Sequence, residues 1–377
     1  MTTKIHGFCD PQFVPFRDAF AANFADGLEL GASFGVTWRG RLVADLWAGH
    51  ADLMRTRPWQ EDTLVPVAST TKIMVMIAAA MVIERGLLDL DTPVARYWPE
   101  FAQGGKAAVT VRDALTHQAG VPGFDVPISD DELCDWTKAT ARLAAEPHWF
   151  GGERKICYHF HTYGLLVGEL IRRVDGRGPR QFLQEEIFAK VGADFLIGLT
   201  PDATNRIAQL KLPAEAFQGE GMLKRMIDSI DMSTLDSLER LAAELPSGNG
   251  YTNGRGIALA GAIIANGGLA DGERLLSPAM IALAGQEHAY GHDLYLGMVR
   301  FGLGFAIDHA DFPSAVPSAM HWGGYGGSGC VMDPASGLAM GYAPNNWTVP
   351  ELPEGQLALD GRLVRFYDAF REVAAVL

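Results

Sequence analysis

PVASTTKIMVMIAAAMVIERG, residues 66–86, is the most informative segment of the chain. All eleven residues from Ile73 to Ile83 are apolar, which predicts a helix that is buried on nearly every side. Gly86 predicts the end of this helix. Lys72 stands at its start, and a buried lysine is costly unless it is paired or neutral. The position of this lysine therefore needs a chemical explanation.

Ser69 and Lys72 are three residues apart and share one face of the expected helix. Both lie in its first turn, where the helix dipole and burial disfavour an ammonium ion and lower its pKa. A neutral amine can take the proton of a serine hydroxyl, so the pair predicts an activated nucleophile. The alternative is that Ser69 caps the helix while Lys72 extends to water. The four-residue pattern alone does not separate these interpretations.

The bulk composition excludes several other classes of protein. The 377 residues suffice for one large domain or two ordinary ones. A net charge of −14 argues against a nucleic-acid partner and against a polybasic membrane surface. The longest apolar run is too short to span a bilayer, and residues 1–16 show no signal-peptide pattern. The four cysteines form no CxxC spacing, which predicts reduced thiols and a cytoplasmic protein.

Strand patterns cluster at both ends of the chain, and helical patterns fill its middle. Residues 11–27 predict an amphipathic helix, 31–52 a β-hairpin, and 362–377 a final helix. We therefore expect an α/β domain built from residues 1–80 and 250–377, interrupted by a mainly helical domain over residues 81–249.

Five segments of the chain together resemble a known family, and no single one of them would be specific enough. ASTTK (68–72) is followed by four others: TVRDALTHQAGVP (110–122), KICYHFHTYGLLVGELIRRVDG (155–176), ELPSGNGYTNGRGIALAGAIIANGG (244–268) and HWGGYGGSGCVMDPASGLAMGYAPN (321–345). In this order they resemble the serine β-lactamase-like superfamily, which includes class C β-lactamases and penicillin-binding proteins. The likeness is greatest to the family VIII serine carboxylesterases. It implies an α/β (α+β) fold, in which an antiparallel sheet is flanked by helices and an all-helical domain completes the active site at the interface.

The resemblance assigns the catalytic roles residue by residue. It makes Ser69 the nucleophile, Lys72 its proton partner and Tyr158 a second general base. A tyrosine suits that role only if adjacent cationic charge lowers its pKa from about 10. Without the motif, Tyr158 would be interpreted as an aromatic residue at the start of a buried helix.

The third motif of the resemblance is Trp322-Gly323-Gly324, where β-lactamases have Lys-Thr-Gly. It predicts a strand that lines the cleft, with glycines that let substrate approach the backbone. Another register would place His321 at the lysine position, and we expect His321 near the substrate as well. Without the resemblance, the segment would be a glycine-rich hairpin or bulge.

The resemblance also implies an oxyanion hole. Its two donors would be the backbone N–H groups of Ser69 and of Tyr325, the residue after the third motif. Such donors stabilise the transition state by about 2.7–4 kcal/mol each.

Two departures from the β-lactamase pattern point to the substrate. Phe160 replaces the asparagine of the Tyr-x-Asn motif, and Trp322 replaces the lysine that would pair with a β-lactam carboxylate. Both changes remove polar recognition and leave apolar surface, which favours an ester with an apolar acyl or alcohol group.

Other motifs are better explained without catalysis. Ser33 lies in a GxSxG pattern that runs into a strand instead of the required strand–turn–helix elbow. Ser328 lacks the closing glycine of that pattern. His288 and His292 lack the glutamate of a zinc-binding HExxH motif. Cys157 is expected to be a small buried residue.

The sequence thus predicts a serine hydrolase that cleaves short-chain carboxylic esters through an acyl-enzyme on Ser69. We expect a small-molecule ester as its partner, no cofactor and no metal. One alternative is a β-lactamase or an amide or peptide hydrolase with the same trio. Another is a non-catalytic penicillin-binding sensor. The oligomeric state is not predicted.

Overall fold

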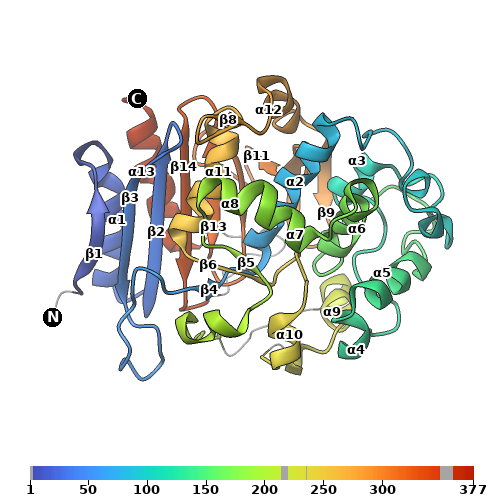
Figure 1. Cartoon of the computed structure of the whole chain (residues 1–377), viewed down its shortest axis with the longest axis horizontal. Helices are drawn as coiled ribbons and strands as arrows, with labels where there is room; N and C mark the ends of the chain where they lie inside the picture. Colours follow the sequence, from blue (N-terminus) through green and yellow to red (C-terminus); the bar gives the residue numbers. More distant parts are fainter. Residues whose placement is uncertain (1–2, 214–219, 235, 349–359) are drawn as a thin grey trace.

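The computed structural model describes residues 3–213, 220–234, 236–348 and 360–377. Within these ranges, nine strands form one antiparallel sheet that joins the two ends of the chain (Figure 1). From edge to edge the strands are β1 (Ile5–Cys9), β3 (Arg41–Gly49), β2 (Gly31–Trp38), β14 (Leu338–Pro344), β13 (Gly329–Asp333), β12 (Met320–Gly323), β11 (Ala306–Ile307), β10 (Gly297–Phe301) and β9 (Ala289–Asp293). The predicted hairpin over residues 31–52 is the β2–β3 pair.

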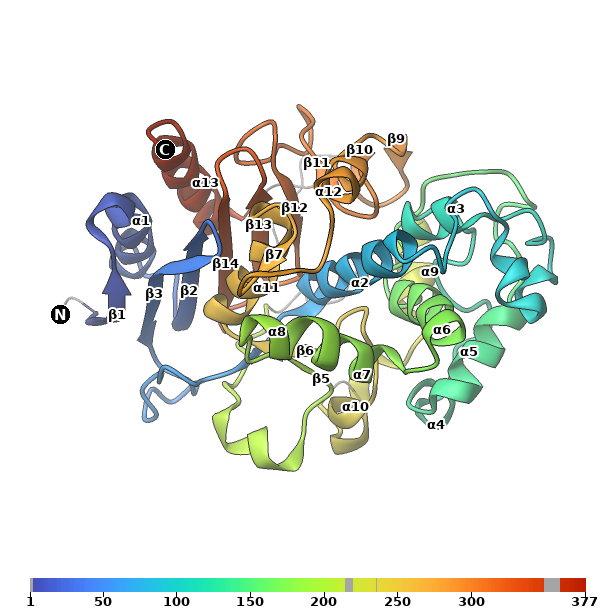
Figure 2. The same cartoon turned by 45° about the horizontal axis from the view of Figure 1, so that its top comes forward.

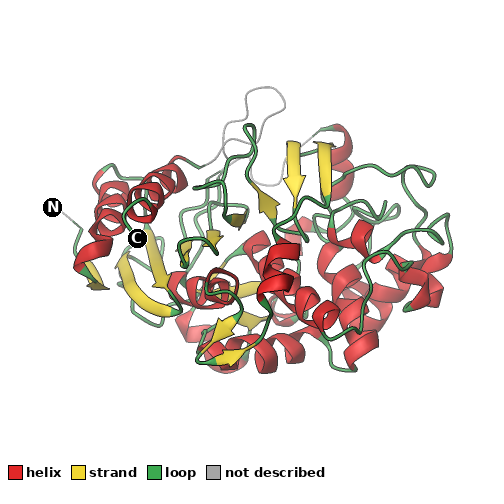
Figure 3. Cartoon of the chain, turned by 90° about the horizontal axis from the view of Figure 1, so that it is seen from above, coloured by secondary structure: helices red, strands yellow, loops and turns green. Residues whose placement is uncertain are grey.

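Helices cover both faces of the sheet. On one face lie α1 (Val14–Ala25) and α13 (Gly361–Ala374), where the rings of Phe34 and Phe366 stack with centroids 4.2 Å apart. The other face carries α11 (Gly254–Ala265). Figure 3 shows both termini at one end of the molecule and most helices gathered at the other. The predicted fold class, an antiparallel sheet flanked by helices, is confirmed.

Glycines let α11 rest directly on the sheet. A Cβ on Gly35 of β2 would lie 2.7 Å from the Cα of Arg255, and one on Gly341 of β14 would lie 2.4 Å from the carbonyl oxygen of Gly254. Both distances are too short for any side chain. The contact fixes the position of α11 against the central strands.

The predicted buried helix is α2 (Lys72–Glu84), which runs between the sheet and the helical part of the molecule (Figure 2). Every residue from Lys72 to Val82 is buried, so the prediction of burial on all sides is confirmed. The α-helix itself begins at Lys72. Ser69 lies in the 3-10 turn that precedes it, η2 (Ala68–Thr71). Ala68 has a left-handed backbone, with φ of +44°.

The helical part of the molecule comes from the middle of the chain. Its α-helices are α3 (Val111–Leu115), α4 (Asp130–Leu133), α5 (Trp136–Ala145), α6 (Tyr163–Asp175), α7 (Pro179–Leu183), α8 (Ala189–Val191), α9 (Gly221–Ile227) and α10 (Leu238–Ala242). Residues 214–219 and 235 of this segment lie outside the described ranges. The division at residues 81 and 249 stays a prediction.

Smaller elements connect these parts. Strands β4 (Val65–Pro66), β6 (Gly250–Thr252) and β5 (Leu196–Ile197) form a short sheet. Its strand β4 leads directly into the 3-10 turn that holds Ser69. Strands β7 (Leu269–Ala270) and β8 (Glu273–Arg274) form a separate hairpin, followed by α12 (Pro278–Ala284). In the described part of the chain, no helix is long and apolar enough to cross a membrane.

Candidate active site

Lys72 and Ser69 meet as the sequence predicts. The Lys72 side chain is fully buried, and its Nζ lies 3.0 Å from the Oγ of Ser69. Two backbone carbonyls complete its surroundings, those of Phe160 at 2.9 Å and Ser247 at 2.8 Å. Burial holds the pKa of Lys72 well below the usual lysine range. The alternative in which Lys72 extends to water is wrong.

Tyr158 lies beside this pair. The Nζ of Lys72 is 4.9 Å from the centroid of the Tyr158 ring, and the Ser69 hydroxyl is close enough to the phenol to influence its proton. Burial raises the pKa of Tyr158 above its usual value, and this outweighs the lowering by Ser69. The condition for Tyr158 to act as a second general base, a pKa lowered by adjacent positive charge, is therefore not met. Lys72 supplies little positive charge because its own burial favours the neutral amine.

The third motif lies against the 3-10 turn that holds Ser69. Gly323 ends β12 and Gly324 follows it, where a Cβ on Gly324 would lie 2.3 Å from the carbonyl oxygen of Val67. Ser328 ties the two segments together, because its Oγ donates to the Val67 carbonyl at 2.8 Å and contacts the Thr70 hydroxyl at 2.8 Å. The glycine is thus required for β12 to reach the turn that carries Ser69.

Trp322 and His321 point to opposite faces of β12, as neighbouring residues of a strand do. The Trp322 ring lies 5.4 Å from the Tyr158 ring, on the catalytic side. The His321 ring packs against Phe312 at 5.1 Å and against Tyr367 of α13 at 6.4 Å. This placement contradicts the expectation that His321 contacts substrate, and it supports the register with Trp322 in the motif.

Aromatic rings surround Tyr158, one of the predicted catalytic side chains. Phe160 is partly exposed and meets the Tyr158 ring edge-on at 6.0 Å. Tyr295, between β9 and β10, stacks on Tyr158 at 6.2 Å and meets Phe160 at 6.4 Å. Its backbone N–H donates to the Asp293 carboxylate at 2.7 Å, which fixes the turn. The surroundings of Tyr158 are therefore aromatic.

The sequence and the fold match known proteins over nearly the whole chain. Residues 18–361 match the beta-lactamase family model. The chain belongs to the beta-lactamase family. It is an enzyme, a serine hydrolase, and the family resemblance predicted from the motifs is confirmed.

Three relatives illustrate the membership. The esterase/beta-lactamase LipL of Mycobacterium tuberculosis is 31% identical over 99% of this chain and 89% of its own length. The crystal structure of a family VIII carboxylesterase is 36% identical and superposes with a TM-score of 0.89, covering 98% of this chain and 100% of that one. A penicillin-binding protein homologue from Caulobacter crescentus is 35% identical with a TM-score of 0.86, at the same coverage of both chains.

The sequence did not single out several residues that build this hydrolase site. Ser247 accepts a hydrogen bond from Lys72 through its carbonyl, while its Oγ donates to the His161 carbonyl at 2.5 Å. Ser247 lies in PSGNG (246–250), within one of the segments that carry the family resemblance, but the sequence indicated no role for it. Tyr295 had no motif at all, because only the packing of the β9–β10 turn brings it to Tyr158.

The set-aside motifs take structural roles in this enzyme. Ser33 is buried in β2, where its Oγ accepts the Gly254 N–H at 2.9 Å. The Nε2 of His288 contacts the Leu283 carbonyl at 2.8 Å. Cys157 is buried, and burial raises the pKa of its thiol.

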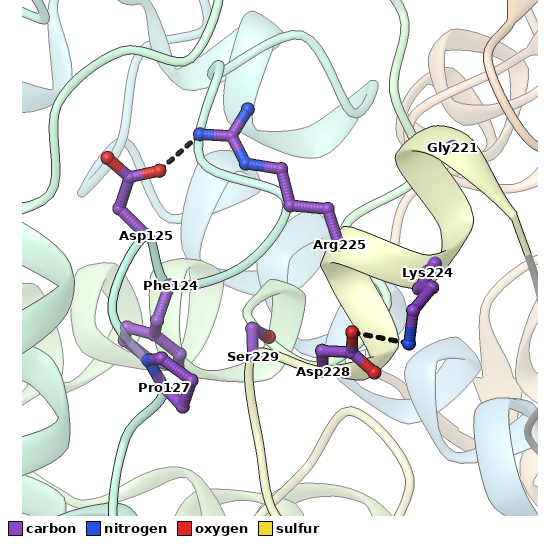
Figure 4. Close-up of a pocket in the computed structure, with 8 residues that line it drawn as sticks. All are labelled: Phe124, Asp125, Pro127, Gly221, Lys224, Arg225, Asp228 and Ser229. Carbon is purple, nitrogen blue, oxygen red and sulfur yellow. Dashed lines mark hydrogen bonds and ion pairs between the residues drawn. The ribbon is translucent and has the colours of Figure 1, made fainter.

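A separate hollow of about 320 Å³ lies between α9 and the segment around Phe124 (Figure 4). Its charges are paired, since Arg225 binds Asp125 and the Nζ of Lys224 lies 2.8 Å from Asp228. It contains none of the predicted catalytic residues.

Proposed function

We propose that this enzyme hydrolyses carboxylic esters through an acyl-enzyme on Ser69. The proposal rests above all on one observation: a fully buried Lys72 amine lies 3.0 Å from the Ser69 hydroxyl. Among the described residues, no carboxylate pairs with Lys72, and burial alone accounts for its lowered pKa. A neutral amine has two N–H donors and one lone pair. The carbonyls of Phe160 and Ser247 occupy the donors, which leaves the lone pair for the hydroxyl proton.

The proton steps follow from these assignments. Ser69 Oγ attacks the ester carbonyl carbon as its proton passes to Lys72, and the N–H groups of Ser69 and Tyr325 stabilise the oxyanion. Because the pKa of Tyr158 is raised, its phenol is a proton donor at neutral pH. It protonates the departing alkoxide, and Lys72 returns its proton to the phenolate. Water then releases the acid with the same groups in reverse order.

The surroundings favour a small ester without a carboxylate of its own. Phe160, Trp322 and Tyr295 supply aromatic surface near Tyr158, and none of them is a cation. A β-lactam carboxylate placed against these three rings would be desolvated and would gain no charged partner from them, which opposes binding. The family VIII carboxylesterase is named for ester hydrolysis, which supports the ester part of this proposal, whereas LipL is named both an esterase and a beta-lactamase.

The test compares short-chain p-nitrophenyl esters with the β-lactam nitrocefin, for wild type and Ser69→Ala. We expect ester turnover that disappears in Ser69→Ala and little cleavage of nitrocefin. Ser33→Ala is the matched control, because it removes a buried hydroxyl that bonds only the Gly254 backbone among the described residues. It should keep the wild-type rate.

Faster turnover of nitrocefin than of any ester would make this a β-lactamase. Stoichiometric acylation without turnover of either substrate would make it a sensor. Ester turnover that survives in Ser69→Ala would refute the assigned nucleophile.

A further inference from the structure

His117 is a buried residue of the THQAG segment for which the proposed chemistry has no use. It follows α3, and its backbone is left-handed, with φ of +61°. Residues other than glycine rarely adopt this conformation, although histidine does so more often than most. A non-glycine residue persists there when surrounding contacts hold it.

Those contacts are two hydrogen bonds to the segment that carries Tyr158. The N–H of Cys157 donates to the His117 carbonyl at 2.9 Å. The N–H of His159 donates to the His117 ring at Nδ1, at 3.0 Å. The two residues on either side of Tyr158 are therefore held by the backbone and the side chain of one residue.

The ring of His117 also touches Tyr158 directly, with centroids 4.9 Å apart in an edge arrangement. Tyr163 at 4.6 Å and Phe301 at 5.3 Å pack around the same ring. Because Nδ1 accepts a hydrogen bond, the neutral ring must carry its proton on Nε2. Burial favours this neutral form by lowering the pKa of His117, and Nε2 has no hydrogen-bond partner among the described residues.

We propose that His117 is a positioning residue that holds the Tyr158 phenol in line with Ser69 and the leaving group. It does not touch the substrate, and its effect passes through its hydrogen bonds to the N–H groups of Cys157 and His159, the residues on either side of Tyr158. The left-handed backbone is what lets one residue present its carbonyl and its ring to the same strand-like segment. This inference rests on the proposed ester hydrolysis and on Tyr158 as the proton donor.

Two variants separate the acceptor from the ring. His117→Phe keeps a ring of similar shape but loses the Nδ1 acceptor. His117→Asn keeps a side-chain acceptor and tolerates a left-handed backbone. The readout is kcat/KM for acetate esters of increasing alcohol pKa, from p-nitrophenyl acetate to an alkyl acetate, since only poor leaving groups need a proton from Tyr158.

We expect His117→Phe to lose about 100-fold in kcat/KM with the alkyl ester and less than about tenfold with the p-nitrophenyl ester, because misplacing a proton donor by about 1 Å can cost about 100-fold. His117→Asn should recover most of the alkyl-ester activity. An equal loss with both esters would reduce His117 to a packing residue, and unchanged kinetics would overturn the proposal.

His148→Phe is the matched control. His148 is also a buried histidine whose Nδ1 accepts backbone hydrogens, here from Phe150 at 3.2 Å and Gly152 at 3.1 Å. Its loop carries no proposed catalytic residue. Even if His148→Phe is less stable, its kcat/KM should depend on the pKa of the leaving alcohol in the same way as that of wild type.

A measurement on the wild-type enzyme covers the case in which His117→Phe does not fold. Nitrogen NMR of histidine-labelled enzyme, with His117→Asn to identify the resonance, reports which ring nitrogen is protonated. A proton on Nδ1 would overturn the proposal. If wild type cleaved neither ester, or if Ser69→Ala kept full activity, the proposed function itself would fail. An equal loss with both esters in His117→Phe would refute only the positioning role of His117.

Discussion

Lys72 and Lys106 are two completely buried lysines, in different parts of the molecule, with the same number of partners. Three backbone carbonyls accept from Lys106: those of Gln103 at 2.8 Å, Ala144 at 3.2 Å and Glu146. Lys72 has two carbonyls and, as its third partner, the hydroxyl of Ser69. Replacing one carbonyl by a hydroxyl replaces a pure acceptor by a group that can give up a proton.

The charges around the two amines also favour a charged Lys106 and a neutral Lys72. Burial lowers the pKa of Lys106 to about 8, and the nearby Glu146 carboxylate opposes this lowering. Lys106 is therefore mostly charged at neutral pH and cross-links three carbonyls. Lys72 has burial without an opposing carboxylate, so its neutral form is favoured. We therefore expect the buried lysine to be a structural cation at Lys106 and a reactive amine at Lys72.

The comparison is tested most strongly by Lys72→Met, which keeps the apolar stem and removes the amine. We expect kcat/KM for p-nitrophenyl butyrate to fall at least about 10³-fold, since a general base contributes about 10²–10⁴. The free energy of unfolding should stay the same or rise, because catalytic groups are often held at a cost in stability. Steady-state kinetics and urea unfolding measure the two quantities.

Lys72→Arg sharpens this prediction, because a guanidinium does not deprotonate in proteins. It should be as inactive as Lys72→Met. Substantial turnover in either variant would contradict a neutral amine as the base.

Lys106→Met should show the reverse pattern. We expect a loss of about 3 kcal/mol in the free energy of unfolding, because three carbonyls lose their buried donor. The kcat/KM of the folded enzyme should stay within about twofold of wild type. Urea denaturation measures the first quantity, and a loss of activity without a loss of stability would place Lys106 in the catalytic site instead.

The pH profile measures the state of Lys72 directly. The neutral amine is the active form, so activity is lost as pH falls through the pKa of Lys72 in the folded enzyme and is retained above it. We expect kcat/KM to change less than about twofold between about pH 8 and 10. An ordinary lysine, with a pKa of about 10.4, would still gain nearly tenfold per pH unit over most of this range. Such a continued rise would mean that Lys72 remains an ammonium ion with an ordinary lysine pKa.

The smallest effect is expected at the aromatic rings around Tyr158. Tyr295→Ala removes a ring that stacks on Tyr158, which should improve kcat/KM for bulky esters relative to acetate by about 10-fold, as expected for pocket contacts of about 1–3 kcal/mol. A series of p-nitrophenyl esters from acetate to octanoate measures the ratio. An unchanged ratio would exclude Tyr295 from the pocket.

Local patterns carried most of what could be predicted. The apolar run after Lys72 predicted a buried helix, and the spacing of Ser69 and Lys72 predicted their contact, because both depend on neighbours within one turn. The sequence could state only the condition for Tyr158 to act as a base, a lowered pKa, because that pKa depends on burial, to which residues far away in the sequence such as Tyr295 contribute. The sequence also could not tell on which face of β12 His321 lies, because the pairing of β12 with its neighbouring strands fixes that face.

By itself, the sequence determined the family, the fold class and the pairing of a serine with a lysine, since these follow from motifs and periodicity along the chain. Only the tertiary structure decided that Lys72 has no carboxylate partner among the described residues whereas Lys106 has Glu146 nearby. It also brought His117 to both sides of Tyr158 and Tyr295 onto its ring. The physical reason is that proton affinity depends on the solvent, charges and dipoles around a group, and folding assembles those from distant parts of the chain.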